Sequence, residues 1–341
     1  MNVRLLEPGE EAAWNAYVEG RRESLLGHRA EWLSILRDSL GHDPRPLVAM
    51  DGEEIRGVLP QVIVPGLIGG RALVSLPWLD GAGPLGDDDE TVLALLRASR
   101  ETGIRERCAY LEIRALREWP EPRPVRKEKV LMVLPLREET ALWKSFSAKV
   151  RNQVRKAEKE GLTAGAGGPE LLGDFYSVFC RNMRDIGVPV WGKEFFAAMM
   201  DRLGERSRIV IVRSGGRPVG GGILLFHRES AVVPSASSLR SHFSLCPNHL
   251  LYWTALKAAA HGGALRFDFG RSTPGSGTWR FKKQWGAEEV PCFWHYALLR
   301  GGRIPEKSTE GPKLRLAVAA WKRMPLFLAN RIGPALVRRI P

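Results

Sequence analysis

The fold is decided by the stretch Arg208-Ile209-Val210-Ile211-Val212-Arg213-Ser214-Gly215-Gly216-Arg217-Pro218-Val219-Gly220-Gly221-Gly222-Ile223-Leu224-Leu225-Phe226. Two apolar runs on either side of a Gly-Gly pair are typical of two strands joined by a tight turn. Apolar residues at helical spacing follow at Leu251, Ala255 and Ala258, and residues 264–270 resemble a further strand. The order strand, turn, strand, helix, strand predicts an α/β unit.

The first half of the chain repeats this order. Residues 46–50, the turn Asp51-Gly52 and residues 55–64 predict two strands, residues 91–102 have helical apolar spacing, and residues 109–114 resemble a strand. A length of 341 residues agrees with two domains, since a domain usually has about 100–200 residues. The sequence therefore predicts an α/β (α+β) fold of two tandem units, each a mixed twisted sheet flanked by helices. A chance likeness of two generic patterns is the alternative.

Two changes in composition set the expected domain boundaries. The proline-rich, charged residues 119–127 are typical of a linker or an edge crossing, because proline cannot donate a ladder hydrogen bond. After Arg300 the chain becomes rich in Lys, Arg and Pro. We therefore expect a first domain over residues 1–133, a second over 134–300 that carries the active site, and a basic amphipathic tail over 301–341.

Composition also narrows the class of protein. A hydrophobic content of 44% excludes intrinsic disorder, and a net charge of +13 favours polyanionic partners such as RNA, anionic lipid or phosphate-bearing substrates. The four cysteines form no CxxC pair and the histidines no HxxxH pair, so no metal site or disulfide framework is predicted. No stretch resembles a signal peptide or a membrane span, and we expect a cytoplasmic protein.

The tail carries about half of the net charge. Residues 307–341 contain eight Lys or Arg residues and one Glu, a net charge of +7, and apolar residues alternate with the cations. Such a segment is typical of a peripheral contact with an anionic membrane surface, here the inner membrane. The alternative is a tail that packs back over the second domain with its cations outward.

Two segments have the composition of a binding site. Residues 149–160 predict a helix with Val150, Val154 and Ala157 on one side. The cations Arg151, Arg155 and Lys159 recur every fourth residue on another side. Because the first part of this helix lacks acidic residues, it is either a phosphate-docking helix or a solvated cationic face.

The second segment is Phe267-Asp268-Phe269-Gly270-Arg271-Ser272, followed by a Gly/Ser/Pro loop and by aromatic residues alternating with cations up to Gly286. Aromatic faces can stack on bases while cations hold phosphates, so the pattern fits a nucleic-acid end; an ordinary hairpin is the alternative. We expect Leu265, Phe267 and Phe269 to fill the apolar side of the strand, which turns Asp268 away from it. No nucleophile elbow or Cys/His signature occurs, which favours direct transfer in a ternary complex over a covalent intermediate.

These residues resemble the FemAB family, and more narrowly its branch associated with exosortase and PEP-CTERM exopolysaccharide systems. The resemblance rests on residues 267–272, 275–279 and 281–286, with further likeness at 83–85 and 151–161, and it covers nearly the whole chain. It implies two tandem GNAT-like domains. It also implies an enzyme that moves an aminoacyl group from aminoacyl-tRNA, or an acyl group, onto an amine of a peptidoglycan, cell-envelope or exopolysaccharide precursor.

The resemblance gives a role to individual residues. Lys282 would stabilise the negative charge on the reacting carbonyl or hold the tRNA 3′ end, and Arg151 and Arg155 would bind precursor phosphates. Asp268 would accept a proton or orient the amine, and Glu112, at the matching position of the first unit, could take that role instead; the alternative for Asp268 is a salt bridge to a neighbouring arginine. The other residues expected to bind substrate are Lys156, Arg271, Ser272, Gly277, Trp279 and Phe281.

The donor stays open at this point. The sequence contains neither a long helical hairpin insertion for tRNA nor the Gly-rich pyrophosphate loop of acetyl-CoA enzymes. We expect no resident cofactor and an aminoacyl-tRNA donor. The two alternatives are an acyl-CoA-dependent GNAT enzyme and a non-catalytic accessory protein on the membrane.

Overall fold

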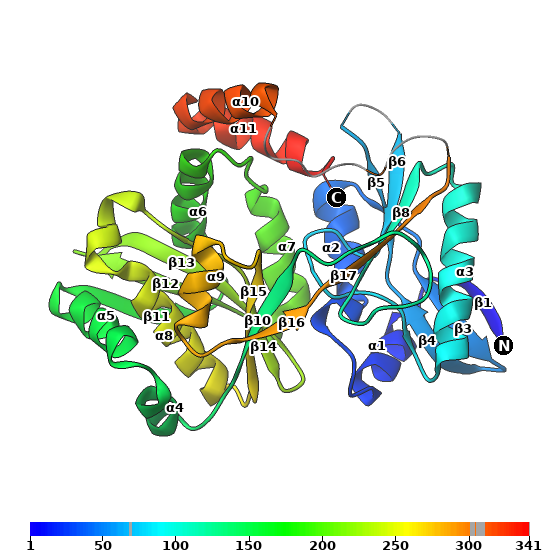
Figure 1. Cartoon of the computed structure of the whole chain (residues 1–341), viewed down its shortest axis with the longest axis horizontal. Coiled ribbons are helices and arrows are strands. Elements are labelled where there is room, and N and C mark those ends of the chain that lie inside the picture. Colours follow the sequence, from blue (N-terminus) through cyan, green and yellow to red (C-terminus); the bar gives the residue numbers. More distant parts are fainter. Residues whose placement is uncertain (68–69, 301–303, 305–310, 341) are drawn as a thin grey trace. The chain divides into compact units, whose positions relative to one another are not determined.

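The computed structural model describes residues 1–67, 70–300, 304 and 311–340 (Figure 1). The chain divides into two compact units. Unit 1 consists of residues 1–129 with the described residues of 291–308 and 335–341, and unit 2 of residues 130–290 with those of 309–334. The mixed α/β architecture predicted from the sequence is confirmed, with helices against mixed sheets in each unit.

Unit 1 contains two sheets and three α-helices among its described residues. Their strand orders are β1-β3-β4-β7 and β2-β5-β6-β8-β17-β9. The elements are β1 (Asn2–Leu5), α1 (Glu11–Gly20), α2 (Glu31–Leu40), β2 (Asp43–Pro44), β3 (Leu47–Asp51), β4 (Glu54–Leu59), β5 (Val62–Pro65), β6 (Arg71–Val74), β7 (Leu85–Gly86), α3 (Asp89–Arg105), β8 (Tyr110–Ala115), β9 (Val125–Arg126) and β17 (Phe293–Leu298).

We expected the second domain to extend to residue 300, but strand β17 belongs to unit 1. It pairs antiparallel with β8 from Phe293↔Ala115 to Leu298↔Tyr110, so the chain returns to the sheet of unit 1 after it has formed unit 2. The residues predicted as a linker include β9, which pairs with β17. Residues 55–64 also differ, because they form two strands in different sheets, β4 and β5. Pro60 lies at the break, where it lacks an N–H for a continuous ladder.

Unit 2 is built on one mixed sheet with the strand order β11-β12-β13-β14-β15-β10-β16. Its helices and strands are β10 (Val130–Pro135), α4 (Glu139–Ser145), α5 (Ala148–Lys159), β11 (Leu162–Gly167), α6 (Leu172–Ile186), α7 (Lys193–Leu203), β12 (Ser207–Ser214), β13 (Arg217–His227), β14 (Ser230–Ser238), α8 (Pro247–His261), β15 (Arg266–Ser272), α9 (Gly277–Lys283), β16 (Glu288–Pro291), α10 (Pro312–Arg323) and α11 (Leu326–Val337).

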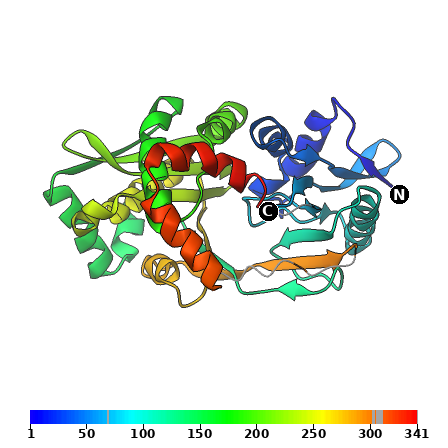
Figure 2. The same cartoon turned by 90° about the horizontal axis from the view of Figure 1, so that it is seen from above.

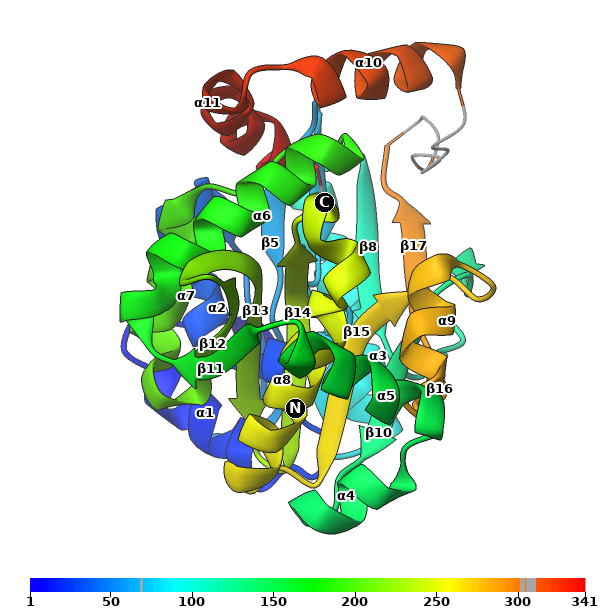
Figure 3. The same cartoon turned by 90° about the vertical axis from the view of Figure 1, so that its left-hand side faces the viewer.

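Helices cover both faces of this sheet (Figure 3). A side chain built at Gly221 of β13 would touch the Phe175 ring of α6, and one built at Gly222 would touch Leu251 of α8. Because consecutive strand residues face opposite sides, α6 and α8 lie on opposite faces. The glycine run of the opening stretch therefore lets two helices approach the centre of the sheet closely.

The strands β14 and β15 are parallel and separate part of the way along. Their pairing runs from Ser230↔Arg266 to Val232↔Asp268 and stops there, although β14 continues to Ser238 and β15 to Ser272. On its other side, β14 takes three steps from Val232 to Ser235 while β13 takes two, so β14 has a bulge at this point. Parallel strands that separate leave backbone groups facing one another without ladder bonds.

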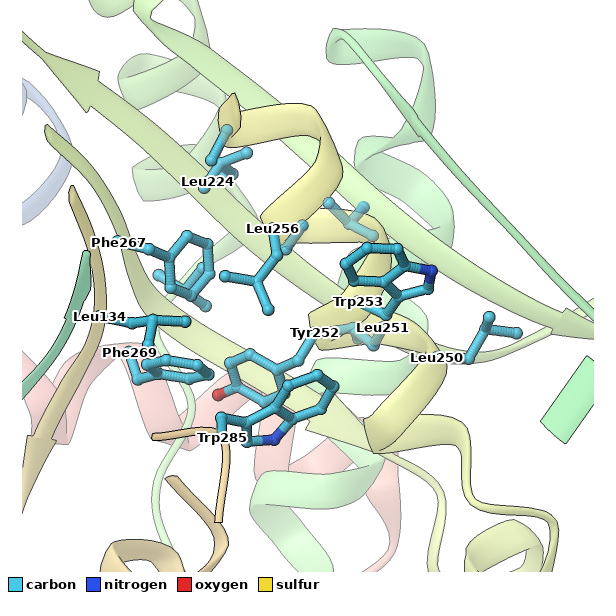
Figure 4. Packing of buried hydrophobic residues seen from close by; sticks show 14 of the residues in the cluster. Leu134, Leu224, Leu250, Leu251, Tyr252, Trp253, Leu256, Phe267, Phe269 and Trp285 are labelled. Carbon is cyan, nitrogen blue, oxygen red and sulfur yellow. The ribbon is translucent and has the colours of Figure 1, made fainter. Parts of the chain in front are cut away.

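The core of unit 2 reaches this point of separation. Phe267 and Phe269 of β15 are buried, as the sequence predicts. Figure 4 shows Phe269 grouped with Tyr252 and Trp285, and the Phe269 and Tyr252 ring centroids lie 5.2 Å apart. Leu265 was expected in this core, but its side chain is 55% exposed. It precedes the first residue of β15, so the alternation of the strand does not yet apply to it.

The described part of the tail forms two helices, of which residues up to Pro334 belong to unit 2 and the last residues of α11 to unit 1. Helix α10 lies against α6, where Val318 contacts Gly187, and Arg184 of α6 donates a hydrogen bond to the Met324 carbonyl at 3.2 Å. Trp321 is buried in this contact. Residues 301–303, 305–310 and 341 of the predicted tail lie outside the described residues. No helix in the described part of the chain has the length and apolarity of a membrane span.

Candidate functional site

Lys282 lies at the place where β14 and β15 separate. Its side chain is buried, and its ammonium donates hydrogen bonds to the carbonyl oxygens of Gly270 at 2.8 Å and Arg271 at 2.9 Å. Both acceptors belong to β15, beyond the last residue that pairs with β14. A buried ammonium is expensive unless backbone dipoles compensate it, so β15 supplies the partners that keep this cation at the separation point.

Helix α9 carries this lysine. The helix begins after Ser276, whose hydroxyl accepts a hydrogen bond from the Trp279 N–H at 3.2 Å and so caps the first turn. The sequence left residues 275–286 open between a ligand loop and a hairpin, and did not predict a helix there. The Ser-Gly-Thr-Trp start was the signal present in the sequence, because serine before a short apolar and cationic run is a common helix start.

Asp268 lies on the same strand, one residue before the buried Phe269. Its carboxylate accepts a hydrogen bond from the Gly270 N–H at 2.7 Å. The carbonyl of this same glycine binds Lys282. One glycine thus connects the carboxylate and the ammonium that the sequence assigned to catalysis.

Gly270 has a backbone conformation and surroundings that exclude a side chain. Its φ is +78°, and a Cβ atom there would lie 3.0 Å from the Val233 carbonyl oxygen of β14. A left-handed conformation costs a residue with a side chain about 1–2 kcal/mol. The close approach of β15 to β14 at this point thus requires a residue without a side chain at position 270.

We predict that Gly270→Ala lowers the free energy of unfolding by about 1–3 kcal/mol, because strain and the contact with Val233 add together. Urea denaturation measures this change. Gly277→Ala is the matched control, since nothing lies within 4 Å of a Cβ atom at Gly277, and it should change stability by no more than about 0.5 kcal/mol. Equal effects of the two substitutions would contradict the prediction.

An aromatic and polar cluster supports α9 from the side of α8. Phe281 packs against His249 at 5.2 Å and Tyr252 at 5.4 Å between ring centroids. Burial and then the charge of Lys149 lower the pKa of His249 to about 4, so its ring is neutral at pH 7. The Gln284 side-chain amide lies 3.2 Å from the His249 Nε2, which accepts its N–H. Neither His249 nor Gln284 was predicted as a site residue, because the helix that brings them together was not predicted.

The same cluster places a second titratable group beside Asp268. Tyr252 is buried, and burial followed by the charge of Asp268 raises the pKa of its hydroxyl group. Tyr252 is therefore neutral at physiological pH and keeps its O–H as a donor. In the sequence this residue stands out only as part of a generic helix pattern.

The other residues expected on α9 and β15 have mixed surroundings. Arg271 and Gly277 are exposed, whereas Ser272 is buried and Trp279 half-buried. Among the described residues, the Ser272 Oγ and the Trp279 Nε1 have no hydrogen-bond partner. Trp279 and Phe281 pack against the core of unit 2. This agrees with the alternative that the aromatic residues are part of the core, although they lie on a helix and not on a hairpin.

The cations of α5 form a separate group. Val150, Val154 and Ala157 of this helix are buried, which confirms the predicted apolar side. Arg151 donates to the carbonyl oxygens of Lys144 at 3.2 Å and Phe146 at 2.6 Å, and so satisfies carbonyl groups at the end of α4. Arg151 therefore has a structural partner, whereas Arg155, which also lies over the Trp143 ring at 5.6 Å, and Lys156 are exposed to solvent.

Glu112 lies in unit 1, whereas Lys282 and its partners lie in unit 2. It is 1% exposed on β8, and its carboxylate accepts a hydrogen bond from the Arg114 Nε at 2.8 Å. The Arg114 guanidinium also donates to the Leu79 carbonyl at 3.1 Å and lies over the Trp294 ring at 4.6 Å. The structure thus places Glu112 in a buried ion pair.

The pairing of β6 with β8 also ends differently from that of β14 with β15. Beyond Val74↔Glu112, the Ser75 N–H donates to the Glu112 carbonyl at 2.9 Å. The Ser75 hydroxyl in turn accepts the Arg114 N–H at 2.8 Å. In unit 1, Ser75 thus occupies the hydrogen-bonding groups at the end of β8. In unit 2, the corresponding end of β15 is bound by Lys282 instead.

Comparison with known proteins agrees with this architecture. Residues 144–283 match the family model described as an acetyltransferase (GNAT) domain, and this range contains β11 to α9 with the lysine site. No curated protein matches the sequence.

Solved structures share the fold over most of the chain. FemX is 16% identical with a TM-score of 0.65, and the match covers 86% of this chain and 97% of FemX. The C-terminal domain of a putative lysylphosphatidylglycerol synthetase from Agrobacterium fabrum is 12% identical with a TM-score of 0.56, covering 91% and 94%. A tandem GNAT protein from the clavulanic acid biosynthesis pathway is 10% identical with a TM-score of 0.56, covering 89% and 99%. Residues 144–283 are thus a GNAT-type domain, and the findings together support an acyltransferase built on the GNAT fold.

Proposed function

We propose that this chain is an N-acyltransferase that moves an aminoacyl group from an activated ester onto an amine of a cell-envelope or exopolysaccharide precursor. The observation that carries the proposal is the buried Lys282 ammonium, fixed by two β15 carbonyls where β14 and β15 separate. A fixed cation in a site with little water is well suited to stabilise an oxyanion.

The reaction needs few protein groups. The amine nitrogen attacks the ester carbonyl carbon, a C–N bond forms, and the carbonyl electron pair moves to the oxygen. When the tetrahedral intermediate collapses, the C–O bond of the ester breaks, and the proton lost by the amine reaches the leaving alkoxide. The protein orients the two reactants and lowers the energy of the oxyanion, for which Lys282 is the proposed donor.

Asp268 is proposed to act on the amine. Its carboxylate is oriented by the Gly270 N–H, and the buried Tyr252 hydroxyl lies within its electrostatic reach. A carboxylate held in this way can orient an amine and accept its proton as the C–N bond forms. Arg155 and Lys156, both exposed on α5, are proposed to bind the phosphates of the precursor or of the donor.

An aminoacyl-tRNA donor is favoured by the FemAB resemblance. The name of the Agrobacterium fabrum protein, which describes a lysyl group on phosphatidylglycerol, supports transfer of an aminoacyl group without naming the donor. The start of α8 also bears on the donor. This helix begins with Pro247, which has no N–H, and the 3₁₀ helix Arg240–Leu245 and the left-handed Cys246 precede it. A proline in the first turn removes one of the N–H groups with which a helix start binds a pyrophosphate.

The second candidate is transfer from an acyl-CoA. It is supported by the description of the matched family as an acetyltransferase, and by the tandem GNAT protein of the clavulanic acid pathway, whose structure is described as the form without AcCoA. In this reaction the bond that breaks is the C–S bond of the thioester, and the thiolate takes the proton. The lysine site would serve both donors in the same way.

A transfer assay tests the proposal. The purified protein is incubated with an extract of envelope precursors and either a pool of aminoacyl-tRNAs or a pool of acyl-CoAs, and products are read by mass spectrometry. We expect a mass increase of one amino-acid residue on an amine-bearing precursor with the tRNA pool. An acyl mass increase with the CoA pool alone would establish the second candidate.

The control in this assay is the protein with Lys283→Met. Lys283 is exposed and pairs with Glu289 at 3.4 Å, next to the buried Lys282 in sequence. It should retain full transfer. Absence of any transfer with both pools would contradict the proposed function.

A further inference from the structure

Helices α10 and α11 follow one another over the outer side of α6 in unit 2 (Figures 1 and 2). They are held there by specific contacts. Val318 packs on Gly187, Pro334 lies near Gly192, and Gly333 lies against the backbone of Val190 so closely that a Cβ atom would be 2.8 Å from its nitrogen. The orientation of both helices is therefore fixed, and each has one side that faces away from unit 2.

The outward side of α11 is apolar to an unusual degree. Phe327 is 71% exposed, Ile332 40% and Leu328 37%. At 100° per residue these side chains lie on one arc of the helix whose centre is opposite the buried Gly333, with Ile332 at the edge nearest the buried Ala329. Arg331 is exposed between them. A side that leaves three large apolar residues in water costs free energy unless something covers it.

The outward side of α10 continues this pattern. Leu316 is 73% exposed, and Arg323 lies seven residues further along, which places it on the same side of the helix. The buried Trp321 and the half-buried Val318 lie on the other side, toward α6. Both helices therefore direct apolar groups and cations outward together.

The charge of this segment has one sign. Residues 311–340 contain no Asp or Glu, while Arg315, Lys322, Arg323 and Arg331 are all exposed. Uncompensated cations beside exposed apolar side chains match an anionic lipid surface, which offers phosphate groups to the cations and a hydrocarbon boundary to the apolar groups. RNA would match the cations and could stack a base on Phe327, but it offers no place for the aliphatic Leu316, Leu328 and Ile332.

We propose that the outward face of α10 and α11, defined by Leu316, Arg323, Phe327, Leu328, Arg331 and Ile332, binds the surface of an anionic phospholipid bilayer. The helices lie in the plane of the interface and do not enter as spans, since neither has the length for one. The apolar side chains enter the boundary of the acyl chains, and the arginines contact lipid phosphates. This inference does not depend on the proposed function.

Vesicle flotation tests it with the full chain and no acyl donor. Vesicles of phosphatidylcholine with phosphatidylglycerol are compared with vesicles of phosphatidylcholine alone. We expect binding to the anionic vesicles that falls steeply as salt is raised, because salt screens exposed charges. Leu316→Ser with Phe327→Ser should weaken binding at least about tenfold. Arg323→Gln and Arg331→Gln should weaken it about fivefold each.

Matched controls come from other exposed positions of unit 2. Phe243 is 47% exposed on the 3₁₀ helix before α8, and Arg217 is exposed on β13, so Phe243→Ser and Arg217→Gln should leave vesicle binding unchanged. Thermal denaturation checks that each variant is folded. Equal binding to both kinds of vesicle, equal loss with the controls, or self-association of the chain without vesicle binding would overturn the proposal. Failure here leaves the transfer assay unaffected.

Discussion

Lys282→Met should reduce transfer turnover by about 10²–10³-fold, the usual loss when one donor to an oxyanion is removed. Methionine has nearly the shape of lysine, so the apolar contacts of α9 are kept while the ammonium is lost. We expect the loss in kcat rather than in KM, because the proposed interaction forms with the oxyanion and not with the ground-state carbonyl. Steady-state kinetics with the donor identified by the transfer assay measure both constants.

Stability has to be separated from catalysis in this variant. The carbonyls of Gly270 and Arg271 lose a donor, which costs about 1–3 kcal/mol when the groups remain buried. Turnover is therefore expressed per folded molecule, with urea denaturation of the same sample. Lys282→Arg should recover part of kcat because it restores the charge with a different geometry. Full turnover of Lys282→Met would remove this lysine from the mechanism and leave it as a structural clamp on β15.

Glu112→Ala should lower the free energy of unfolding by about 3–5 kcal/mol. The carboxylate is the close charge partner of Arg114 at 2.8 Å, and both side chains are almost fully buried. Its removal takes away the nearest negative charge of the guanidinium in the core of unit 1, and leaves it with backbone carbonyls, the Trp294 ring and the weaker attraction of Asp80. Urea denaturation followed by tryptophan fluorescence measures the change.

Two further variants make this result specific. Glu54→Ala removes an exposed carboxylate of the same unit, and should change stability by no more than about 0.5 kcal/mol. Glu112→Ala combined with Arg114→Met should recover part of the loss, because no unpaired charge then remains buried. We expect turnover per folded molecule to stay near that of the parent protein. A large loss of turnover without a loss of stability would give Glu112 the catalytic role that the sequence left open for it.

The sequence predicted the fold class well because it depends on local pattern. The strands around Gly215-Gly216, helix α8 with its apolar spacing, and the end of α6 at Gly187 all follow from period, turn residues and caps. The path of β17 could not be predicted in this way. Residues 293–298 have the composition of any strand, and their partner β8 lies about 180 residues earlier in the chain, so only tertiary packing selects it.

The candidate site was predicted in part. Lys282, Asp268 and Gly270 stand out in the sequence by residue type, and the structure brings them together through hydrogen bonds. The grouping of His249 and Gln284 could not be predicted, because it requires a short helix whose start depends on the Ser276 cap. Short helices carry little periodic signal, and their formation depends on packing more than on propensity.

The return of β17 to unit 1 has a consequence for synthesis on the ribosome. Strand β8, which holds Glu112 and Arg114, pairs with β6 on one side but gains β17 on its other side only after residues 130–290 have left the exit tunnel. Until then the nascent amino-terminal half has an open sheet edge, the kind of surface that chaperones shield and that other chains can pair with. A fragment ending at residue 129 would keep that edge permanently, so the two halves of this protein cannot be separated by cutting the chain once.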